Sequence, residues 1–515
     1  MTENGAAGRA AEAAGNGAGT AGPFSGGGGA AVLLPLLIYA VLVFLFRGFV
    51  IDDSYITYRY ADNIVRGGAP SFNADDETPV EGYTSFLWVA LSAAAIRAGI
   101  DPLAATRTVG VAAGGGAILL LFLLARDLFG RRPAALLPPL ALALSAEHAE
   151  WSVSGMETAF FLFLFLLALR FLLRELKEGG FARSSLLFGA LAATRPEGAI
   201  LFGVALLFRT GAALREGSGV KKSLRRGGAA LLPFLAVYLP YYAWRLATYR
   251  LPFPNSYYAK RIAHAGAPHL GEWALYLGPV LLLAAAALLP FAARRSGHGR
   301  PLLLWLMTLT AVPVLWNIIP VMAWDWRLLL HLHPLLFLLA AAPVAALAAG
   351  GGRARRIAAA ALAALLLLWT AHPERLEGRI DRARRTGRGI RAAHIRTGLW
   401  IKKSYPPDTV IALIDTGAIP YVTRMRAIDI ANIPLNNRRL AAGRYTLADF
   451  WNDEPDLIVV REDEEGRLAA HPVREVLVRD ALRRGFRRIR HAKYDENYYL
   501  VVLADPLNNP RERRR

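Results

Sequence analysis

Residues 31–51 read AVLLPLLIYAVLVFLFRGFVI, and residues 52–63 continue the chain as DDSYITYRYADN. An apolar run of about 20 residues is long enough to cross a lipid bilayer. Two adjacent carboxylates are costly to remove from water, so Asp52 and Asp53 are expected at the membrane surface or in a wet cavity. This stretch predicts a membrane protein whose first span ends at a pair of acids.

The rest of the composition agrees with a chain that crosses the membrane many times. Of the 515 residues, 54% are hydrophobic, and no cysteine is present, which excludes disulfides and thiolate metal sites. We predict an α-helical polytopic protein with about eleven transmembrane helices. The expected spans are 31–51, 107–126, 133–147, 157–173, 184–194, 198–208, 228–246, 272–292, 301–320, 334–349 and 356–371.

The basic residues predict how these spans are oriented. The net charge is +20, but before residue 371 the basic side chains cluster between apolar runs, as in cytoplasmic loops and not as on a nucleic-acid surface. We therefore expect a protein of the cytoplasmic membrane with a cytoplasmic N-terminus, a disordered tail over residues 1–29 and an extracytoplasmic C-terminus. The clusters are Arg126–Arg132, Arg174–Arg183, Arg209–Arg226, Arg294–Arg300 and Arg353–Arg356.

Two segments depart from simple spans. Residues 51–106 form one large external loop in this topology, and residues 83–98 are expected as a helix lying in the outer interface. Residues 184–194 and 198–208 are each short for a full span. We interpret them as a half-depth helical hairpin that turns at Arg195–Gly198, where protein or water must cover the backbone.

The acid pair has the chemistry of a catalytic base. A membrane enzyme that deprotonates an incoming hydroxyl group needs a carboxylate at this depth. On a helix that begins at Asp52, Asp53 shares one face with Tyr60, and Asp52 shares another with Arg59. One acid then faces a cavity while Arg59 or the positive helix N-terminus holds the other. The alternative is that both aspartates only cap the helix.

Further polar and aromatic side chains are expected on the external side. They lie in the loop FNADDETPVEGYTSFLW (72–88), the segment PFPNSYYAKR (252–261) and the motif WDWR (324–327). Hydroxyl, carboxylate and amide groups suit sugar recognition, aromatic rings stack on sugars, and cations bind phosphate. Aromatic belts and ordinary exposed loops have similar compositions. The candidate substrate-binding residues here are Arg59, Tyr60, Glu81, Tyr83, Thr84, Asn255, Tyr257, Lys260, Asp325 and Arg327.

The hairpin tip adds three more candidates for substrate binding. Arg195 and Glu197 lie at the turn, where a buried cation needs either a lipid-linked phosphate or a carboxylate partner in the protein. Glu157 begins a span three residues after Ser154, a spacing that predicts a capping box, with substrate contact as the second interpretation.

Residues 372–515 predict a separate α/β domain outside the membrane. A basic helix over 373–405 ends before Pro406, and TVIALIDTG, PDLIVVRED and YYLVVLADP predict strands. About 140 residues suffice for one such domain. Asp415 follows the first strand, where an acid is more often a helix cap than a functional group.

The string DDSYITYRYADNIVRGG (52–68), followed by EGYTSFLW (81–88), resembles bacterial polytopic glycosyltransferases of the GT-C fold. The likeness is greatest to terminal arabinofuranosyltransferases of arabinan cell walls and to related membrane proteins of flagellar motor control. It continues through SGMET, TRPEG, PNSYYAK, AWDWR and DTGAIPYVTRMRAIDI, and so covers most of residues 40–435 in order. The chain departs from the family at Met322–Trp326, where a Gly-rich turn is expected, and at Asn432–Leu435.

This resemblance implies a polyprenyl-phosphate sugar donor and an active-site aspartate in the first external loop, here Asp53 or Asp52. The expected reaction transfers a sugar, such as the pentofuranose arabinofuranose, to a cell-envelope glycan on the outer face of the membrane. A phosphate leaving group needs only cations, so we expect no cofactor and no catalytic metal. The alternative is a non-catalytic scaffold or a lipid-sugar transporter, although no internal repeat of the kind found in transporters is present.

Overall fold

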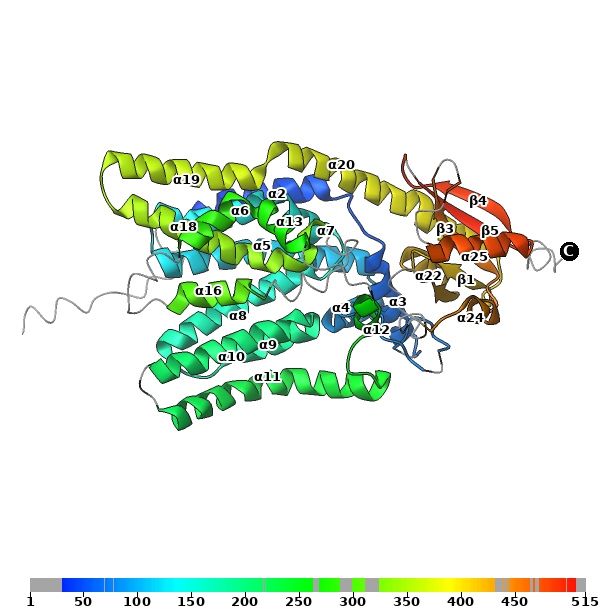
Figure 1. The fold of residues 1–515 in the computed structure, drawn as a ribbon, viewed down its shortest axis with the longest axis horizontal. Helices are drawn as coiled ribbons and strands as arrows, with labels where there is room; N and C mark the ends of the chain where they lie inside the picture. Colours follow the sequence, from blue (N-terminus) through cyan, green and yellow to red (C-terminus); the bar gives the residue numbers. More distant parts are fainter. Residues whose placement is uncertain are drawn as a thin grey trace, which may run out of the picture.

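The computed structural model describes residues 30–505, apart from 69, 77, 216, 218, 263–267, 288–298, 311–323, 431–438, 440–441, 443, 464–465, 468–471 and 497. The expected tail over residues 1–29 and the segment Asn432–Leu435 lie outside these residues. A bundle of helices forms one part of the molecule, and a small sheet domain lies at one end of it (Figure 1).

The bundle comprises η1 (Ala30–Val32), α2 (Leu33–Phe46), α3 (Asp53–Val65), α4 (Phe86–Arg97), α5 (Pro102–Phe129), η2 (Pro133–Leu136), α6 (Leu137–Leu144), α7 (Ala146–Val153), α8 (Thr158–Glu178), α9 (Arg183–Thr194), α10 (Glu197–Arg215), α11 (Val220–Tyr249), α12 (Asn255–Ile262), α13 (Pro268–Leu277), α14 (Pro279–Ala286), α16 (Gly299–Thr308), η4 (Trp324–Leu332), α18 (His333–Ala349) and α19 (Arg353–Ala371). The helices follow the apolar runs of the sequence, because each run needs a backbone that satisfies its own hydrogen bonds in lipid.

Within the part of the chain that the structure describes, fewer helices meet the length and composition expected of a span than the eleven spans predicted. Among the described residues, four helices are long and apolar enough to cross a membrane: Pro102–Phe129, Glu197–Leu214, Trp326–Ala349 and the helix that starts at Arg353. A fifth qualifies if α7 and α8 count as one broken span, in which the helix axis bends by 115° at the break. The expectation of about eleven spans is therefore not confirmed.

The turn of the predicted half-depth hairpin is confirmed, and its second helix is longer than expected. α9 ends at Thr194 and α10 begins at Glu197, as the short apolar runs predicted. α10, however, continues to Arg215 and is long enough to cross the membrane. Its extra turns contain Arg209, which pairs with Glu175 of α8 at 2.8 Å, so an ion pair extends the helix beyond its apolar part.

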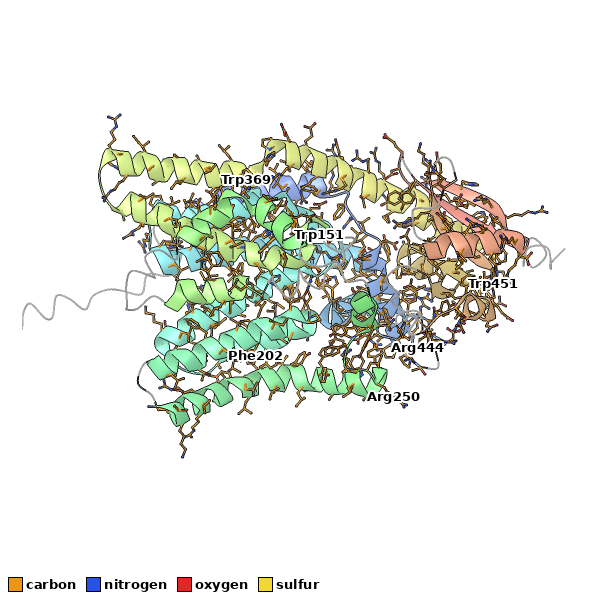
Figure 2. The ribbon with its side chains drawn as sticks, viewed as in Figure 1. Trp151, Phe202, Arg250, Trp369, Arg444 and Trp451 are labelled. Atoms are coloured by element: carbon orange, nitrogen blue, oxygen red, sulfur yellow. The ribbon has the colours of Figure 1, made fainter. Side chains whose placement is uncertain are left out.

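Glycines allow α5 and α7 to pack closely. A Cβ on Gly110 would lie 2.4 Å from the carbonyl oxygen of Ser152, and one on Gly114 would lie 2.6 Å from the Ser152 hydroxyl. These close approaches fix α7 across the end of the bundle that faces the sheet domain. The same helix carries Trp151, which lies near that end (Figure 2).

The bundle separates its basic helix ends from its acids. The ends of α10, α11 and α19 that point away from the sheet domain (Figure 1) carry basic residues of the predicted cytoplasmic clusters, among them Arg209, Lys221 and Arg353. α3, α4, α7 and the sheet domain lie at the other end. The predicted division of the chain into a basic end and an acidic, aromatic end therefore has a counterpart in the fold.

A long helical segment, interrupted at His372, joins the bundle to the domain. α19 runs into α20 (Pro373–Gly389), η5 (Ile390–Ile395) and α21 (Arg396–Ser404), and η5 is a π-helical segment. π-Segments are uncommon and often occur at functional sites. The predicted basic helix ending before Pro406 is confirmed, but it is not separate from the last span.

The domain contains β1 (Val410–Leu413), α22 (Ala418–Thr423), β2 (Arg426–Asp429), α24 (Leu447–Asn452), β3 (Leu457–Glu462), α25 (Pro472–Arg483), β4 (Arg487–Lys493) and β5 (Tyr499–Ala504). The sheet order is β2-β1-β3-β5-β4. β1 is parallel to β2 and β3, with Ile411 opposite Ala427 and Leu457, whereas β5 is antiparallel to both β3 and β4. Apolar side chains cover both faces of β1 and β3, as their continuous apolar runs predicted.

Candidate active site

Asp53 lies at the first position of α3 and faces a cation from a distant segment. Its Oδ2 is 3.4 Å from Nη1 of Arg327 in η4. The Asp53 side chain is 54% exposed and that of Arg327 is 13% exposed. Burial by the surrounding protein raises the pKa of Asp53, Arg327 acts to lower it, and the net shift is upward from 3.8. Asp53 is thus accessible to solvent and better suited to accept a proton near neutral pH than an ordinary aspartate.

Asp52 has a different environment from its neighbour. Its carboxylate accepts hydrogen bonds from the backbone N–H groups of Gly417 (2.7 Å) and Ala418 (2.8 Å), and its Oδ1 lies 3.2 Å from Nδ1 of His394. Burial acts to raise the pKa of Asp52, but His394 and the two N–H groups outweigh it and hold this pKa below 3.8. Asp52 therefore joins the bundle to the sheet domain. Asp52 occupies the N-cap position of α3, but its side chain makes no capping hydrogen bond to this helix.

His394 connects Asp52 to a second acid. Its Nε2 is 3.5 Å from Oδ2 of Asp415, and its side chain is only 1% exposed. Asp415 is held in turn by a two-pronged ion pair with Arg461 of β3. The aspartate expected as a cap after β1 is therefore part of an ionic network at the junction of bundle and domain.

Arg327 is held in place by the bundle. Its guanidinium carbon lies 5.3 Å from the ring centroid of Trp151, within the range of a cation–π contact. Trp326, the preceding residue, has φ of 58°, which a bulky side chain rarely adopts. Such a conformation persists only where the surrounding structure fixes it, so the start of η4 is under local constraint.

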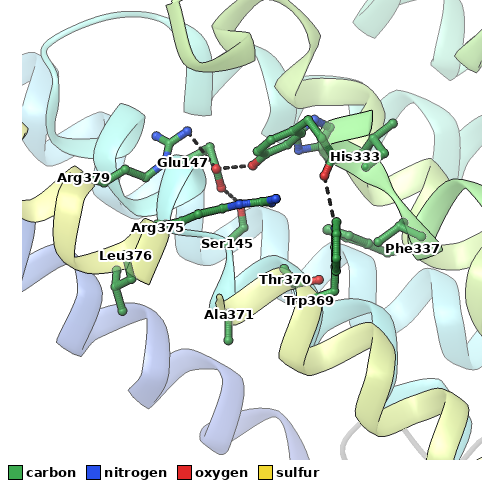
Figure 3. Close-up of a pocket in the computed structure, with 14 residues that line it drawn as sticks. Ser145, Glu147, His333, Phe337, Trp369, Thr370, Ala371, Arg375, Leu376 and Arg379 are labelled. Atoms are coloured by element: carbon green, nitrogen blue, oxygen red, sulfur yellow. Dashed lines mark hydrogen bonds and ion pairs between the residues drawn. The ribbon is translucent and has the colours of Figure 1, made fainter. Parts of the chain in front are cut away.

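A second ionic cluster involves two acids of α7, the helix that carries Trp151. Arg379 of α20 donates to Glu150 at 2.6 Å and pairs with Glu147 at 2.8 Å. Glu147 also accepts hydrogen bonds from the hydroxyls of Ser145 and Tyr276. Figure 3 shows Glu147 at the centre of these contacts. The set links α7, α13 and α20 and fixes the angle at which the long helix leaves the bundle.

A small cavity adjoins this cluster. It has a volume of about 30 Å³ and is lined in part by Tyr276, His333, Trp369 and Arg375 (Figure 3). The Arg375 guanidinium lies over the Tyr276 and Trp369 rings at 5.4 and 5.0 Å. A space of this size holds about two water molecules and is too small for a sugar ring.

The hairpin-tip cation has partners within the protein. Arg195 donates to Glu197 at 2.8 Å and to Glu157 at 3.2 Å, and its side chain is buried. Of the two interpretations of Arg195, the internal ion pair is the one the structure contains. The capping box at Ser154 is wrong: α8 begins at Thr158, Glu157 itself occupies the N-cap, and the Ser154 hydroxyl donates to the carbonyl of Trp151.

The two α3 residues predicted to bind substrate, Arg59 and Tyr60, are buried instead. Each nitrogen of the Arg59 guanidinium donates to a backbone carbonyl, those of Phe72, Pro420 and Met425. The Tyr60 hydroxyl donates to the carbonyl of Val80. Arg59 therefore holds the sheet domain against the external loop and does not hold either acid.

The 81–84 loop also packs inside the protein. Glu81 forms an ion pair with Arg245 of α11 at 2.6 Å, and its carbonyl accepts from the N–H of Asn255 at 2.9 Å. Burial raises the pKa of Glu81 to about 7. The Tyr83 hydroxyl is 3.0 Å from that of Tyr249. These residues tie α11 and α12 to the external loop.

The remaining candidates have different outcomes. Thr84 is half-buried, and Tyr257 is 40% exposed and packs against Phe253. Lys260 lies in α12 and Asp325 in η4, but their side chains fall outside the described residues, as do Met322 and Ala323. Of the candidates predicted from the sequence, the structure brings together Asp53 with Arg327 and Arg195 with Glu157 and Glu197. It also brings together Glu81 with Asn255 and Tyr60 with Tyr83.

Several residues of these networks were not anticipated from the sequence. They are Glu150, Arg245, Arg379, His394 and Arg461. The basic helix around His394 carries no spacing pattern that marks this residue. The string DTG, with Asp415 and Gly417, was the one available signal, because it belongs to the resemblance described above.

Comparisons with known proteins agree with this architecture. The chain is similar to ArnT from Cupriavidus metallidurans, in crystal structures bound to undecaprenyl phosphate and in the apo state, each with 15% identity and a TM-score of 0.56. The bound structure covers 93% of this chain and 98% of ArnT, and the apo structure 92% and 97%. An oligosaccharyltransferase from Archaeoglobus fulgidus, in complex with zinc and sulfate, has 13% identity and a TM-score of 0.50 over 83% of this chain and 67% of its own.

These likenesses identify the fold. The protein is a membrane protein with the GT-C fold, as the sequence resemblance predicted. Residues 384–508 match a domain of unknown function (DUF8728), which spans the end of α20, the π-segment and the sheet domain. A search of curated protein sequences returns no match.

Proposed function

We propose that the protein transfers a sugar from a polyprenyl-phosphate donor to a glycan hydroxyl at the outer face of the cytoplasmic membrane, with Asp53 as the base. The observation that carries this proposal is the pair of Asp53 and Arg327. It combines a solvent-accessible carboxylate of raised pKa with a cation at the end of a candidate span. The two charges needed at a sugar-phosphate reaction centre, a proton acceptor and an anion-stabilising group, lie within 3.4 Å of each other.

The proposed step conserves atoms and charge. The acceptor O–H gives its proton to Asp53 while its oxygen attacks the anomeric carbon of the donor. The bond between that carbon and the phosphate oxygen breaks, and polyprenyl phosphate leaves with the electron pair. Arg327 lies where it can stabilise the negative charge that grows on the phosphate.

The phosphate is assigned to Arg327 and not to Arg195. Arg195 lies between two carboxylates, Glu157 and Glu197, so that group of three carries a net negative charge. Arg327 has a single described carboxylate partner, at the longer distance of 3.4 Å. An incoming phosphate is therefore repelled less at Arg327.

The donor and sugar classes rest on likeness. A protein with the same fold has been crystallised with undecaprenyl phosphate, which supports a polyprenyl-phosphate carrier here. The resemblance to arabinofuranosyltransferases supports a pentofuranose such as arabinofuranose and a cell-envelope glycan acceptor. Exposed apolar side chains of α19, among them Leu365 and Leu368, offer a surface suited to a long isoprenoid chain.

The orientation rests on the basic clusters. The basic ends of α10, α11 and α19 lie at the end of the bundle away from α3 and the sheet domain. Basic connections favour the cytoplasm, so the reaction centre and the domain face the outside of the cell.

The test is transfer by the full-length protein in nanodiscs. Radiolabelled polyprenyl-phosphate arabinofuranose, ribofuranose and hexoses are each incubated with synthetic arabinofuranosyl oligosaccharides and with an envelope glycan fraction. We expect a labelled glycan with the pentofuranose donor, and none from the Asp53→Asn protein. Donor binding without product from any pair would overturn the enzyme and leave a scaffold, and movement of the donor between leaflets without product would indicate a transporter.

A further inference from the structure

The segment that ends at the acid pair is held by the long helix and the sheet domain. A Cβ on Gly387 of α20 would lie 1.9 Å from the carbonyl oxygen of Gly48, so the two backbones are in direct contact. The second contact is with Asp52, four residues after Gly48: a Cβ on Gly417 would lie 2.0 Å from the carbonyl oxygen of Asp52. Residues 48–52 are thus in close backbone contact at both ends with Gly387 and Gly417, which lie more than 300 positions away in the chain.

Arg107 holds the middle of the same segment. Its Nη2 donates to the carbonyl of Phe49, and its Nε donates to the carbonyl of Val153 at 2.8 Å. The bundle therefore fixes one side of the segment and the tail fixes the other. The only side chain that reaches the segment's last residue, Asp52, from the long helix is His394 among the described residues.

His394 lies in the π-helical segment η5, which determines the direction of its side chain. A π-turn adds a residue to a helical turn and so changes the direction of the side chains that follow. Here it places the buried His394 ring between Asp52 and Asp415, at 3.2 and 3.5 Å. Because a carboxylate only accepts hydrogen bonds, Nδ1 of His394 donates to Asp52.

We propose that His394 is a positioning residue for the transfer reaction: by donating from Nδ1 to Asp52, it fixes the start of α3 so that Asp53 faces Arg327. The C-terminal domain then completes the reaction centre without contacting substrate. This inference rests on the proposed function, because Asp53 is the base in both. It assigns Asp52 to orientation, since three donors occupy its carboxylate, and proton transfer to Asp53 alone.

The charges around His394 are arranged to keep this donor in place. Asp52 faces Nδ1 from the start of α3, and Asp415 faces Nε2 from the turn after β1. Arg461 of β3 neutralises Asp415, and the Tyr494 ring lies 5.4 Å from the imidazole. The His394 ring is therefore surrounded by two carboxylates, the cation that pairs with one of them, and an aromatic ring.

Two substitutions of His394 separate positioning from simple structural support. His394→Asn keeps a donor near the position of Nδ1, whereas His394→Gln carries its amide further out, near Nε2, and loses the donor to Asp52. In nanodiscs with the polyprenyl-phosphate pentofuranose donor, we expect His394→Gln to lower kcat on the order of 100-fold, as small displacements of a reacting group do, with KM for the donor unchanged. His394→Asn should keep most of the kcat of the wild-type protein.

Hydrogen exchange provides a readout that does not depend on turnover. Peptides covering residues 48–56 should exchange faster in His394→Gln than in wild-type protein or His394→Asn, while Tm stays within a few degrees in all three. Equal kcat for the Asn and Gln variants, or unchanged exchange in both, would overturn the positioning role. Absence of transfer by the wild-type protein, with the exchange pattern as expected, would overturn the proposed function and leave the clamp on Asp52 intact.

Gly417→Ala is a second route to the same displacement. Its new methyl group would meet the Asp52 backbone and should lower kcat without removing any charge. Gly203→Ala is the matched control, because a Cβ there meets nothing within 4 Å. If Gly417→Ala transfers sugar at the wild-type rate, the position of Asp52 does not control the base and the proposal fails.

Discussion

Asp53 and Arg327 are 274 positions apart in the chain, and their charged groups lie 3.4 Å apart in space. The pair forms because α3 follows the first apolar helix after the short segment 47–52 and η4 directly precedes α18, so both lie at the same end of the bundle. The adjacent acid, Asp52, is turned toward the sheet domain. Of these two adjacent residues, Asp53 is therefore available to act as the proposed base, and Asp52 attaches the start of α3 to the sheet domain.

Replacement of Asp53 by Asn should remove the base and preserve the fold. General-base catalysis contributes about 10²–10⁴-fold, so kcat for transfer should fall by that factor. Because Asp53 is 54% exposed and has one long ion-pair contact, the change should leave Tm nearly unaffected. Steady-state transfer and thermal unfolding in detergent measure the two effects. Retention of kcat above a tenth of the wild-type value would exclude Asp53 as the base.

The pH dependence of transfer should follow the Asp53 carboxyl. This group must be ionised to accept a proton, so activity rises as pH increases through its pKa, which lies above the ordinary value of 3.8. Arg327 acts to lower that pKa, so Arg327→Gln should move the acidic limb of the kcat profile to higher pH. Arg327→Lys keeps the charge and should leave the limb close to its wild-type position. A limb that moves to lower pH in Arg327→Gln would contradict the pairing.

A close backbone approach makes Gly387 sensitive to a single methyl group. Gly387→Ala places a Cβ 1.9 Å from the Gly48 carbonyl oxygen, and such overpacking costs about 1–3 kcal/mol of unfolding free energy. Gly378→Ala, in the same helix, meets no atom within 4 Å and should be neutral or slightly stabilising, since Ala is favoured over Gly in helices. Thermal unfolding of both variants in one detergent provides the comparison. Equal Tm values for the two variants would show that the contact between α20 and Gly48 is not tightly packed.

The fold and part of the site were predictable from the sequence. The apolar runs located the helices, and the charge pattern placed the acids, the WDWR segment and the tail together at one end. Asp53 and Arg327 were both candidates for this reason. Their proximity follows from topology alone, because the ends of antiparallel helices on one side of a bundle converge.

The failures have a common physical cause. α3 was expected in an external loop, with Arg59 and Tyr60 as candidates for substrate binding, but the sheet domain packs against it. Arg59 and Tyr60 therefore became buried contacts between segments. The role of His394 depends on Asp52, 342 positions away, and on a π-turn that no residue pattern announces. These contacts depend on how the domain packs on the bundle. The apolar periodicity of the sequence predicts helices and strands but not how two domains pack together.

The cluster of Arg379 with Glu147 and Glu150 tests whether the long helix is held by charge. Removal of the cation in Arg379→Met leaves two buried carboxylates without their counter-ion, which costs about 3–5 kcal/mol. Arg384→Met removes an exposed pair with Asp381 at 3.8 Å and should cost less than about 1 kcal/mol.

A combined variant distinguishes loss of the cation from loss of packing. Replacing Glu147 and Glu150 with Gln in the Arg379→Met protein neutralises the two carboxylates that Arg379 contacts, so most of the lost stability should return. Recovery of Tm in the triple variant would show that uncompensated charge caused the loss. If the triple variant is as unstable as Arg379→Met alone, the aliphatic stem of Arg379 and the hydrogen bonds to Glu147 hold α20 in place, and the ionic account of this junction is wrong.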